Sequence, residues 1–197
     1  MVNLKNINKS KKTYVDSEHE LLIIGIHKGK KLKPQHRSLD SLINYKLSKA
    51  IDLDSFDGKI NIRLMIYGND SIKRVVIIGL GEQKDYSSDI VRSVGSNIMK
   101  YVDKLKIATF SIDGDSLGLT KKSFAQAFSE GLVLGSYEFN NYKTQKNKDI
   151  KAETVIIYGG SDKKNLDKGF VLGKSVCFAR DLGNHPANIL TPSYLAK

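Results

Sequence analysis

Residues 74–81 read Arg-Val-Val-Ile-Ile-Gly-Leu-Gly, and this stretch decides the class of fold. Four large aliphatic side chains follow one another from Val75 to Ile78, so in a strand they point alternately to opposite faces. Leaving one face in water would forgo about 1.5–3 kcal/mol for each side chain on it. Both faces therefore need a cover, as in the central strands of sheets that carry helices on both sides.

Further strands are predicted where other short runs are rich in Ile, Val and Leu: residues 21–26, 60–67, 106–112 and 154–158. The clearest helix covers residues 88–105, because its aliphatic side chains recur three or four positions apart and form one face: Ile90, Val94, Ile98, Val102 and Leu105. Ser87 or Ser88 can cap its first turn. Strands that alternate with helices indicate an α/β layered domain.

A second helix is predicted from residue 121 or 123 to about residue 139. Ala127, Gly131 and Gly135 lie four positions apart in it, and a stripe of small residues permits close approach of a neighbouring element. A weaker helix is predicted over residues 36–50, a polar loop over 140–151, and a final helix over about 166–182. We therefore predict a mixed, mostly parallel sheet with helices on both faces over residues 1–163.

Composition is that of an ordinary globular chain, with 40% hydrophobic and 27% charged residues among 197. Residues 1–12 are polar and lysine-rich, unlike a secretory signal, and no apolar run approaches the roughly 20 residues of a membrane-spanning helix. Cys177 is the sole cysteine, which excludes an internal disulfide and a CxxC site. We expect a cytoplasmic protein that does not associate with membranes.

The formal charge is +11, from 32 Lys and Arg against 21 Asp and Glu. Such an excess raises nucleic acid as a partner. The lysines are scattered over the chain without an interleaved set of aromatic residues, and this scatter favours a general bias in composition over a nucleic-acid surface.

Two glycine motifs fail the spacing of a phosphate or nucleotide site. Gly173-Lys174-Ser175 resembles the end of a P-loop, but Lys168 stands where that loop requires glycine. Gly79 and Gly81 follow a strand, but the third glycine position of a dinucleotide-binding loop is Lys84.

The motifs for a metal site and for a catalytic nucleophile are also incomplete. His19-Glu20 begins like the zinc-binding HExxH, but Ile23 occupies the second histidine position. His27, His36 and His185 have no Cys, Asp or Glu at ligand spacing, and Ser136 lacks the surroundings of a nucleophile elbow. No catalytic, cofactor-binding or metal-binding residue is assigned from the sequence.

Three segments, taken in order, resemble the leucyl aminopeptidase family of cytosolic metallopeptidases. The first is residues 74–81 with the helix that follows. The second, residues 130–144, reads EGLVLGSYEFNNYKT and is similar to the family's EGxxLGxYxFxxYKT. The third, residues 179–192, reads ARDLGNHPANILTP and is similar to ARDLxNxPANxLTP, with His185 where many members carry another residue, often Glu.

The resemblance implies a macrodomain-like N-terminal domain over residues 1–163, a linker helix over 164–182, and the start of a catalytic peptidase domain over 183–197. Family members hold two divalent metals, zinc or manganese, in the C-terminal domain, release N-terminal residues from peptides and assemble as homo-hexamers. Their catalytic motifs, similar to GKGxxFDTGG and NTDAEGR, do not occur here. We therefore expect a non-catalytic piece, truncated before the catalytic domain, with no cofactor of its own.

The resemblance also implies that part of the final helix faces the catalytic domain, and we expect this face to include Phe170, Cys177 and Phe178. Two alternatives stay open. The chain could be a free-standing module for a nucleotide or ADP-ribose, with Gly159-Gly160-Ser161-Asp162 as the weak candidate for a phosphate loop. It could instead be a nucleic-acid-binding module, as the charge suggests.

Overall fold

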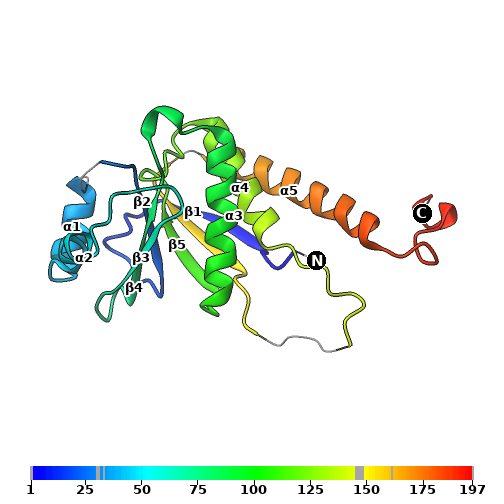
Figure 1. The fold of residues 1–197 in the computed structure, drawn as a ribbon, viewed down its shortest axis with the longest axis horizontal. Helices are drawn as coiled ribbons and strands as arrows, with labels where there is room; N and C mark the ends of the chain where they lie inside the picture. The colour runs from blue at the N-terminus through cyan, green and yellow to red at the C-terminus, as the bar shows by residue number, and fades with distance from the viewer. Residues whose placement is uncertain (1, 30–31, 33, 145–148, 161, 197) are drawn as a thin grey trace.

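The computed structural model of the chain describes residues 2–29, 32, 34–144, 149–160 and 162–196. Within these ranges the strands form one mixed sheet (Figure 1): β1 Asn6–Ser10, β2 Leu22–Ile26, β3 Arg63–Tyr67, β4 Arg74–Gly79, β5 Thr109–Asp113 and β6 Thr154–Tyr158. Their order is β1-β6-β5-β2-β4-β3. Only the pairing of β3 with β4 is antiparallel, which confirms the predicted sheet type.

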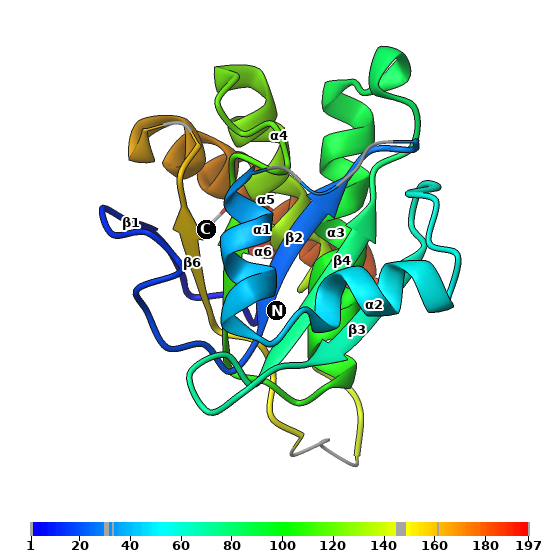
Figure 2. The same ribbon diagram turned by 90° about the vertical axis from the view of Figure 1, so that its left-hand side faces the viewer.

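Helices cover both faces of the sheet, as predicted (Figures 1 and 2). One face carries α1 Pro34–Leu42 and α2 Lys46–Leu53, and the other carries α3 Ser88–Lys104 and α4 Lys122–Gly135. A short 3-10 helix, Gln83–Asp85, precedes α3. The long helix α5 Lys163–Asn184 packs on α4, and α6 Pro192–Leu195 follows it. None of the described helices is both long and apolar enough to cross a membrane.

Strands β2 and β4 separate two hydrophobic cores. Leu22, Ile24, Val75 and Ile77 pack with α1 and α2, while Ile23, Val76 and Ile78 point the other way and pack with α3 and α4. Val75 to Ile77 are 0% exposed. The two-sided burial inferred from this stretch is therefore confirmed.

Helices α3, α4 and α5 approach one another through glycines. A Cβ placed on Gly131 would lie 2.1 Å from the carbonyl oxygen of Arg92 in α3, and one on Gly169 would lie 2.0 Å from that of Gln126 in α4. Both distances are far shorter than a van der Waals contact, so only hydrogen fits at these positions. The stripe of small residues predicted in α4 thus marks the seam with α3.

One strand was not predicted, and one prediction of local structure is wrong. The polar N-terminal segment contains an edge strand, β1, which pairs in parallel with β6 and buries Leu4 and Ile7. The single helix expected over residues 36–50 is two helices, because Asn44 and Tyr45 adopt left-handed φ angles of 59° and 58°. The carboxylate of Asp40, at the end of α1, then accepts hydrogen bonds from the first free amides of α2.

Substitution of the seam glycine tests the close approach of α3 and α4. Gly131→Ala is expected to lower the free energy of unfolding by about 1–3 kcal/mol, because the helices must separate to admit the methyl group. Gly183→Ala in α5 is the matched control, since nothing lies within 4 Å of its added Cβ, and it should change stability by less than about 1 kcal/mol. Urea unfolding measures both; equal effects would contradict the packing described.

Candidate functional site at the carboxyl edge of the sheet

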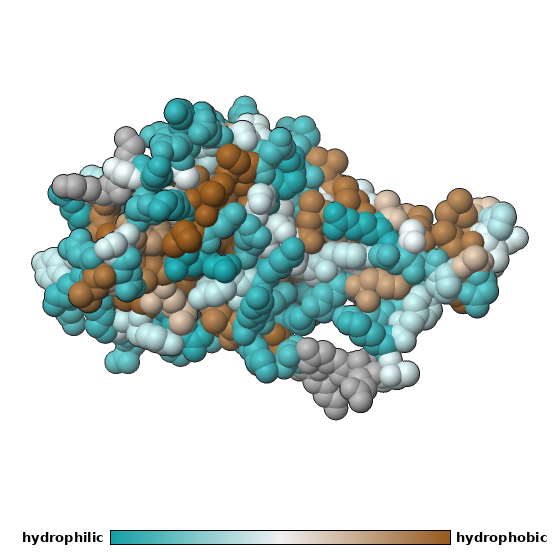
Figure 3. All heavy atoms as spheres, viewed as in Figure 1, coloured by the Kyte–Doolittle hydropathy of each residue, from teal (hydrophilic) through white to brown (hydrophobic). Residues whose placement is uncertain are grey.

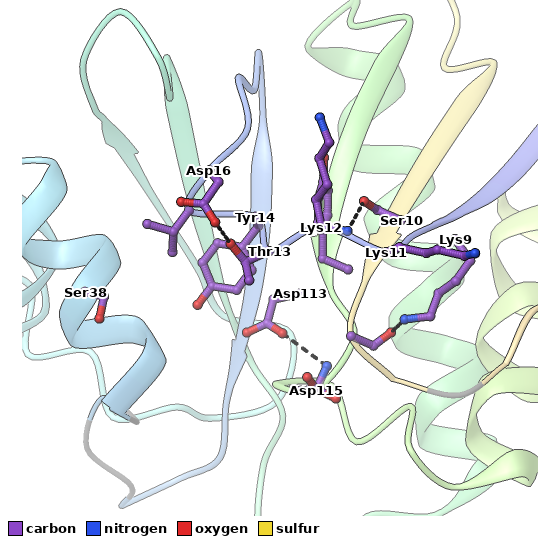
Figure 4. Close-up of a pocket in the computed structure, with 13 residues that line it drawn as sticks. Lys9, Ser10, Lys11, Lys12, Thr13, Tyr14, Asp16, Ser38, Asp113 and Asp115 are labelled. Carbon is purple, nitrogen blue, oxygen red and sulfur yellow. Dashed lines mark hydrogen bonds between the residues drawn. The ribbon is translucent and has the colours of Figure 1, made fainter.

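A cavity of about 790 Å³ opens at the carboxyl ends of β1, β5 and β6 (Figure 4). Ligands of open α/β sheets bind outside the carboxyl ends of the strands, and the volume is in the range of small-molecule sites. The residues that line it come from the ends of these strands, the segment after β1, and helix α1: Lys9, Ser10, Lys11, Lys12, Thr13, Tyr14, Val15, Asp16, Ser38, Asp113, Asp115, Tyr158 and Gly159.

Asp113, the last residue of β5, ties one wall together. It is 1% exposed, and its Oδ1 accepts hydrogen bonds from the amides of Asp115 and Ser116 at 3.1 and 3.3 Å. Its Oδ2 lies 3.0 Å from Nε2 of the buried His36 in α1. The Ser116 hydroxyl donates to the Asp113 carbonyl and accepts from the amide of Gly25 in β2. The loop after β5 is therefore fixed to both α1 and the sheet.

Tyr14 forms part of the opposite wall. Its carbonyl oxygen lies 2.7 Å from Nε2 of His19, whose Nδ1 lies 2.8 Å from the hydroxyl of Ser111 in β5. The side chain is 6% exposed, and its ring packs edge-on against Tyr158. Its hydroxyl has no hydrogen-bond partner among the described residues. Burial, with the nearby charges of Asp113 and Asp115, raises the pKa of Tyr14, so this hydroxyl stays protonated.

The glycine turn after β6 is already filled by an anion of the chain itself. Gly159 and Gly160 adopt φ angles of 65° and 75°, and the Gly160 amide donates to Oδ1 of Asp115 at 2.7 Å. A Cβ on Gly159 would lie 2.1 Å from the other oxygen of that carboxylate. Ser161 lies outside the described residues, and Asp162 caps α5 by accepting from the Asn165 amide. The turn proposed as a phosphate loop thus encloses a carboxylate, which disfavours the nucleotide alternative.

The other motif residues are dispersed. His19 is buried and hydrogen-bonded, whereas His27 lies near the carbonyl of Gly81 and packs against Tyr86. Gly173 lies in the middle of α5 against Val133, far from any strand-to-helix turn. Across residues 2–29, 32, 34–144, 149–160 and 162–196, no group of three or more His, Cys, Asp or Glu is placed to hold a metal ion.

Sequence reasoning missed the cavity. Tyr14 lies in a polar stretch with no periodicity, and β1, which carries the lysines to the same edge, was not predicted. The one available signal was the isolated aromatic residue between Lys12 and the strand at residue 22.

Helix α5 presents an apolar surface different from the one expected. Cys177 is 1% exposed and belongs to the core, and Phe170 is half-buried against that core. The expectation is therefore wrong for Cys177, whereas Phe178 is 65% exposed and its contact with a catalytic domain stays a prediction. Figure 3 shows apolar side chains along this projecting part of the molecule, where the exposed ones are Val171, Leu172, Val176, Phe178, Ile189, Tyr194 and Leu195.

The strand order and the helices on both faces define an α/β domain built on a mixed, mostly parallel sheet. Residues 23–146 match the model of the cytosol aminopeptidase family, N-terminal domain. Probable cytosol aminopeptidase of Persephonella marina is 31% identical over 177 residues, which are 85% of this chain and 36% of that protein. The protein of the same name in Alkaliphilus oremlandii is 28% identical over 90% of this chain and 38% of its own length. The chain belongs to the cytosol aminopeptidase family, as its N-terminal domain.

Solved structures agree with this assignment. A mutant of tomato leucine aminopeptidase aligns with a TM-score of 0.79 and 25% identity over 99% of this chain and 41% of that one. The bottromycin maturation enzyme BotP has the same fold, with a TM-score of 0.68 and 22% identity over 90% of this chain and 35% of its own. The chain therefore spans well under half the length of the relatives it matches.

Removal of the Tyr14 hydroxyl tests whether it lacks a partner. Tyr14→Phe is expected to leave the free energy of unfolding unchanged or to raise it by up to about 1 kcal/mol, because no hydrogen bond is lost. Tyr137→Phe should lower it by about 1 kcal/mol, because that hydroxyl bonds Asp181 at 2.9 Å and Asn184 at 3.0 Å. A Tyr14→Phe variant destabilised as much as Tyr137→Phe would show an undetected partner.

Acid is expected to destabilise the domain through His19. Burial lowers the pKa of His19 from its ordinary value of 6.5. As the pH falls, His19 is protonated in the unfolded chain before it is protonated in the folded chain. Its contribution to the free energy of unfolding is therefore fully present above the pKa of His19 in the unfolded chain and is lost as the pH falls through that pKa. Between pH values of about 7.5 and 5.5, His19 should therefore account for part of the loss of stability, up to the limit of roughly 1.4 kcal/mol that one proton can contribute over this range. Urea unfolding of the chain and of His19→Gln at both pH values isolates this part; an equal loss in both would refute it.

Proposed function

We propose that the chain serves as the N-terminal domain of a longer metallo-aminopeptidase that releases N-terminal amino acids, leucine among them, from peptides. The observation that carries the proposal is the family match over residues 23–146, together with relatives of which this chain covers only 36–38%. The relatives bear the name of aminopeptidases, and the matched part of the family is its N-terminal domain.

The described residues do not fit the two divalent metals that the family implies. Paired ions require several carboxylates that converge on one place, and no such group exists among them. The zinc or manganese ions of the proposed enzyme would therefore be held outside these ranges, and no step of the reaction is assigned to residues of this domain.

The apolar surface of α5 is consistent with a structural role in the longer protein. A helix of 22 residues is about 33 Å long, and only its first part is held firmly by α4 (Figure 1). Phe178 and its exposed neighbours form the type of apolar surface that marks a contact with another protein part. We propose that the peptidase domain covers it, and that the whole enzyme is a cytoplasmic homo-hexamer.

The gene that encodes the chain tests this proposal. The coding sequence after residue 197 is expected to contain segments similar to GKGxxFDTGG and NTDAEGR. The complete product, purified with manganese or zinc, should release leucine from a leucine amide and elute as a hexamer. A reading frame that stops at residue 197 would overturn the proposal.

The described chain alone is expected to lack peptidase activity. Incubated with manganese or zinc, it should release leucine from a leucine amide no faster than the metal alone, because it has no grouping of carboxylates and lysine that could bind paired ions and activate water. Dialysis followed by metal analysis should leave fewer than two bound ions per chain. An active leucine aminopeptidase is the positive control, and turnover by the chain would place the catalytic residues within it.

A further inference from the structure

The acceptors around the carboxyl-edge cavity are already engaged. A carboxylate offers about four acceptor positions. Asp113 uses three of them for Asp115, Ser116 and His36, and Asp115 accepts from the Gly160 amide. Asp16 accepts from the hydroxyl of Thr13. A ligand that offered mainly donors, such as a free amine, would have to share these carboxylates with the hydrogen bonds that they already accept within the chain.

In contrast, several hydrogen-bond donors around the cavity have no partner among the described residues. The Tyr14 hydroxyl is buried without a partner among the described residues, although a buried polar group of this type normally has one. Lys11 and Lys12 are exposed, and their ammonium groups make no hydrogen bond or ion pair with the described residues. Lys9 differs, because its Nζ donates to the carbonyl of Gly159 and so connects β1 with the glycine turn. Unused donors and unused positive charge therefore meet at one cavity.

We propose that this cavity binds a small anionic molecule whose phosphate or carboxylate group pairs with Lys11 and Lys12 and whose neutral polar part accepts a hydrogen bond from Tyr14. Figure 4 shows the hydroxyl of Tyr14 directed toward the space between Ser38 and Asp113, with Lys11 and Lys12 on the other side of Asp113 from Ser38. Tyr14 is one of the residues that line the cavity, so its hydroxyl lies beside the space that a ligand would occupy. The volume of about 790 Å³ admits a molecule as large as a mononucleotide or a dipeptide.

Charge sets the direction in which such a ligand lies. Asp113 and Asp115 raise the pKa of Tyr14, so the end of the cavity near them is negative. The anionic group is therefore directed to the lysines of the segment after β1, while a neutral polar part with hydroxyl or amide groups faces the carboxylates. The raised pKa also keeps Tyr14 a donor throughout the neutral range. This site is separate from the proposed peptidase chemistry and stands without it.

Titration calorimetry at low salt tests the proposal with three probes: inorganic phosphate, adenosine monophosphate and the dipeptide leucyl-glycine. At least one is expected to bind, and its affinity should fall as salt is added. The first two probes identify phosphate as the recognised group, and the dipeptide identifies carboxylate. Tyr14→Phe should raise the dissociation constant of adenosine monophosphate or of the dipeptide about fivefold, whichever binds, and Lys11→Ala with Lys12→Ala should raise that of any bound probe about tenfold.

Matched variants control for surface charge and for tyrosine content. Lys100→Ala with Lys104→Ala removes the same charge at the end of α3, and Tyr67→Phe removes an exposed hydroxyl. Both should leave the affinity unchanged. Lys11 and Lys12 are exposed, so their replacement tests the site even where a change at Tyr14 reduces the folded fraction. Failure of all three probes to bind, or binding that is equal in the cavity variants and their controls, would overturn the proposal.

Discussion

The two-sided burial of β2 and β4 is the constraint on which the remaining structure depends. Their side chains alternate between two cores, so neither face of the sheet can be left in water. Helices α1 and α2 must cover one face and α3 and α4 the other. Parallel β2, β4, β5, β6 and β1 then all end at one edge, where the ends of β1, β5 and β6 and the segments that follow them line the cavity together with α1.

The packing of α3, α4 and α5 on one another depends on close backbone contacts more than on side chains. Gly131 and Gly169 allow α3, α4 and α5 to lie closer together than larger residues would permit. The position of α5 on the domain is consequently fixed over the part that contacts α4. Its far part carries exposed aliphatic and aromatic side chains, so the rigid and the interactive portions of one helix are separate along its length.

The sequence predicted the elements whose burial is two-sided or strongly periodic, and it failed where burial is one-sided or where the backbone turns. Val75 to Ile78 and the face of α3 could be recognised because their patterns repeat. Strand β1 could not, since Asn6, Asn8 and Lys9 surround the single inward side chain of Ile7. The break at Asn44 and Tyr45 depends on Asp40 and has no signature of its own. The cavity combines residues as distant as Tyr14, Asp113 and Gly159, and no local pattern could predict that meeting.

The carboxylate of Asp115 occupies the glycine turn after β6. Backbone amides in such a turn attract anions, and here a carboxylate on the same chain takes that position. A tethered group of this type competes at an effective concentration of roughly millimolar or higher. A phosphate from solution would have to displace this carboxylate and would then lie close to its negative charge. The turn is therefore blocked by the chain's own carboxylate, and an anion from solution would meet the exposed ammonium groups of Lys11 and Lys12 more readily than the amide of this turn.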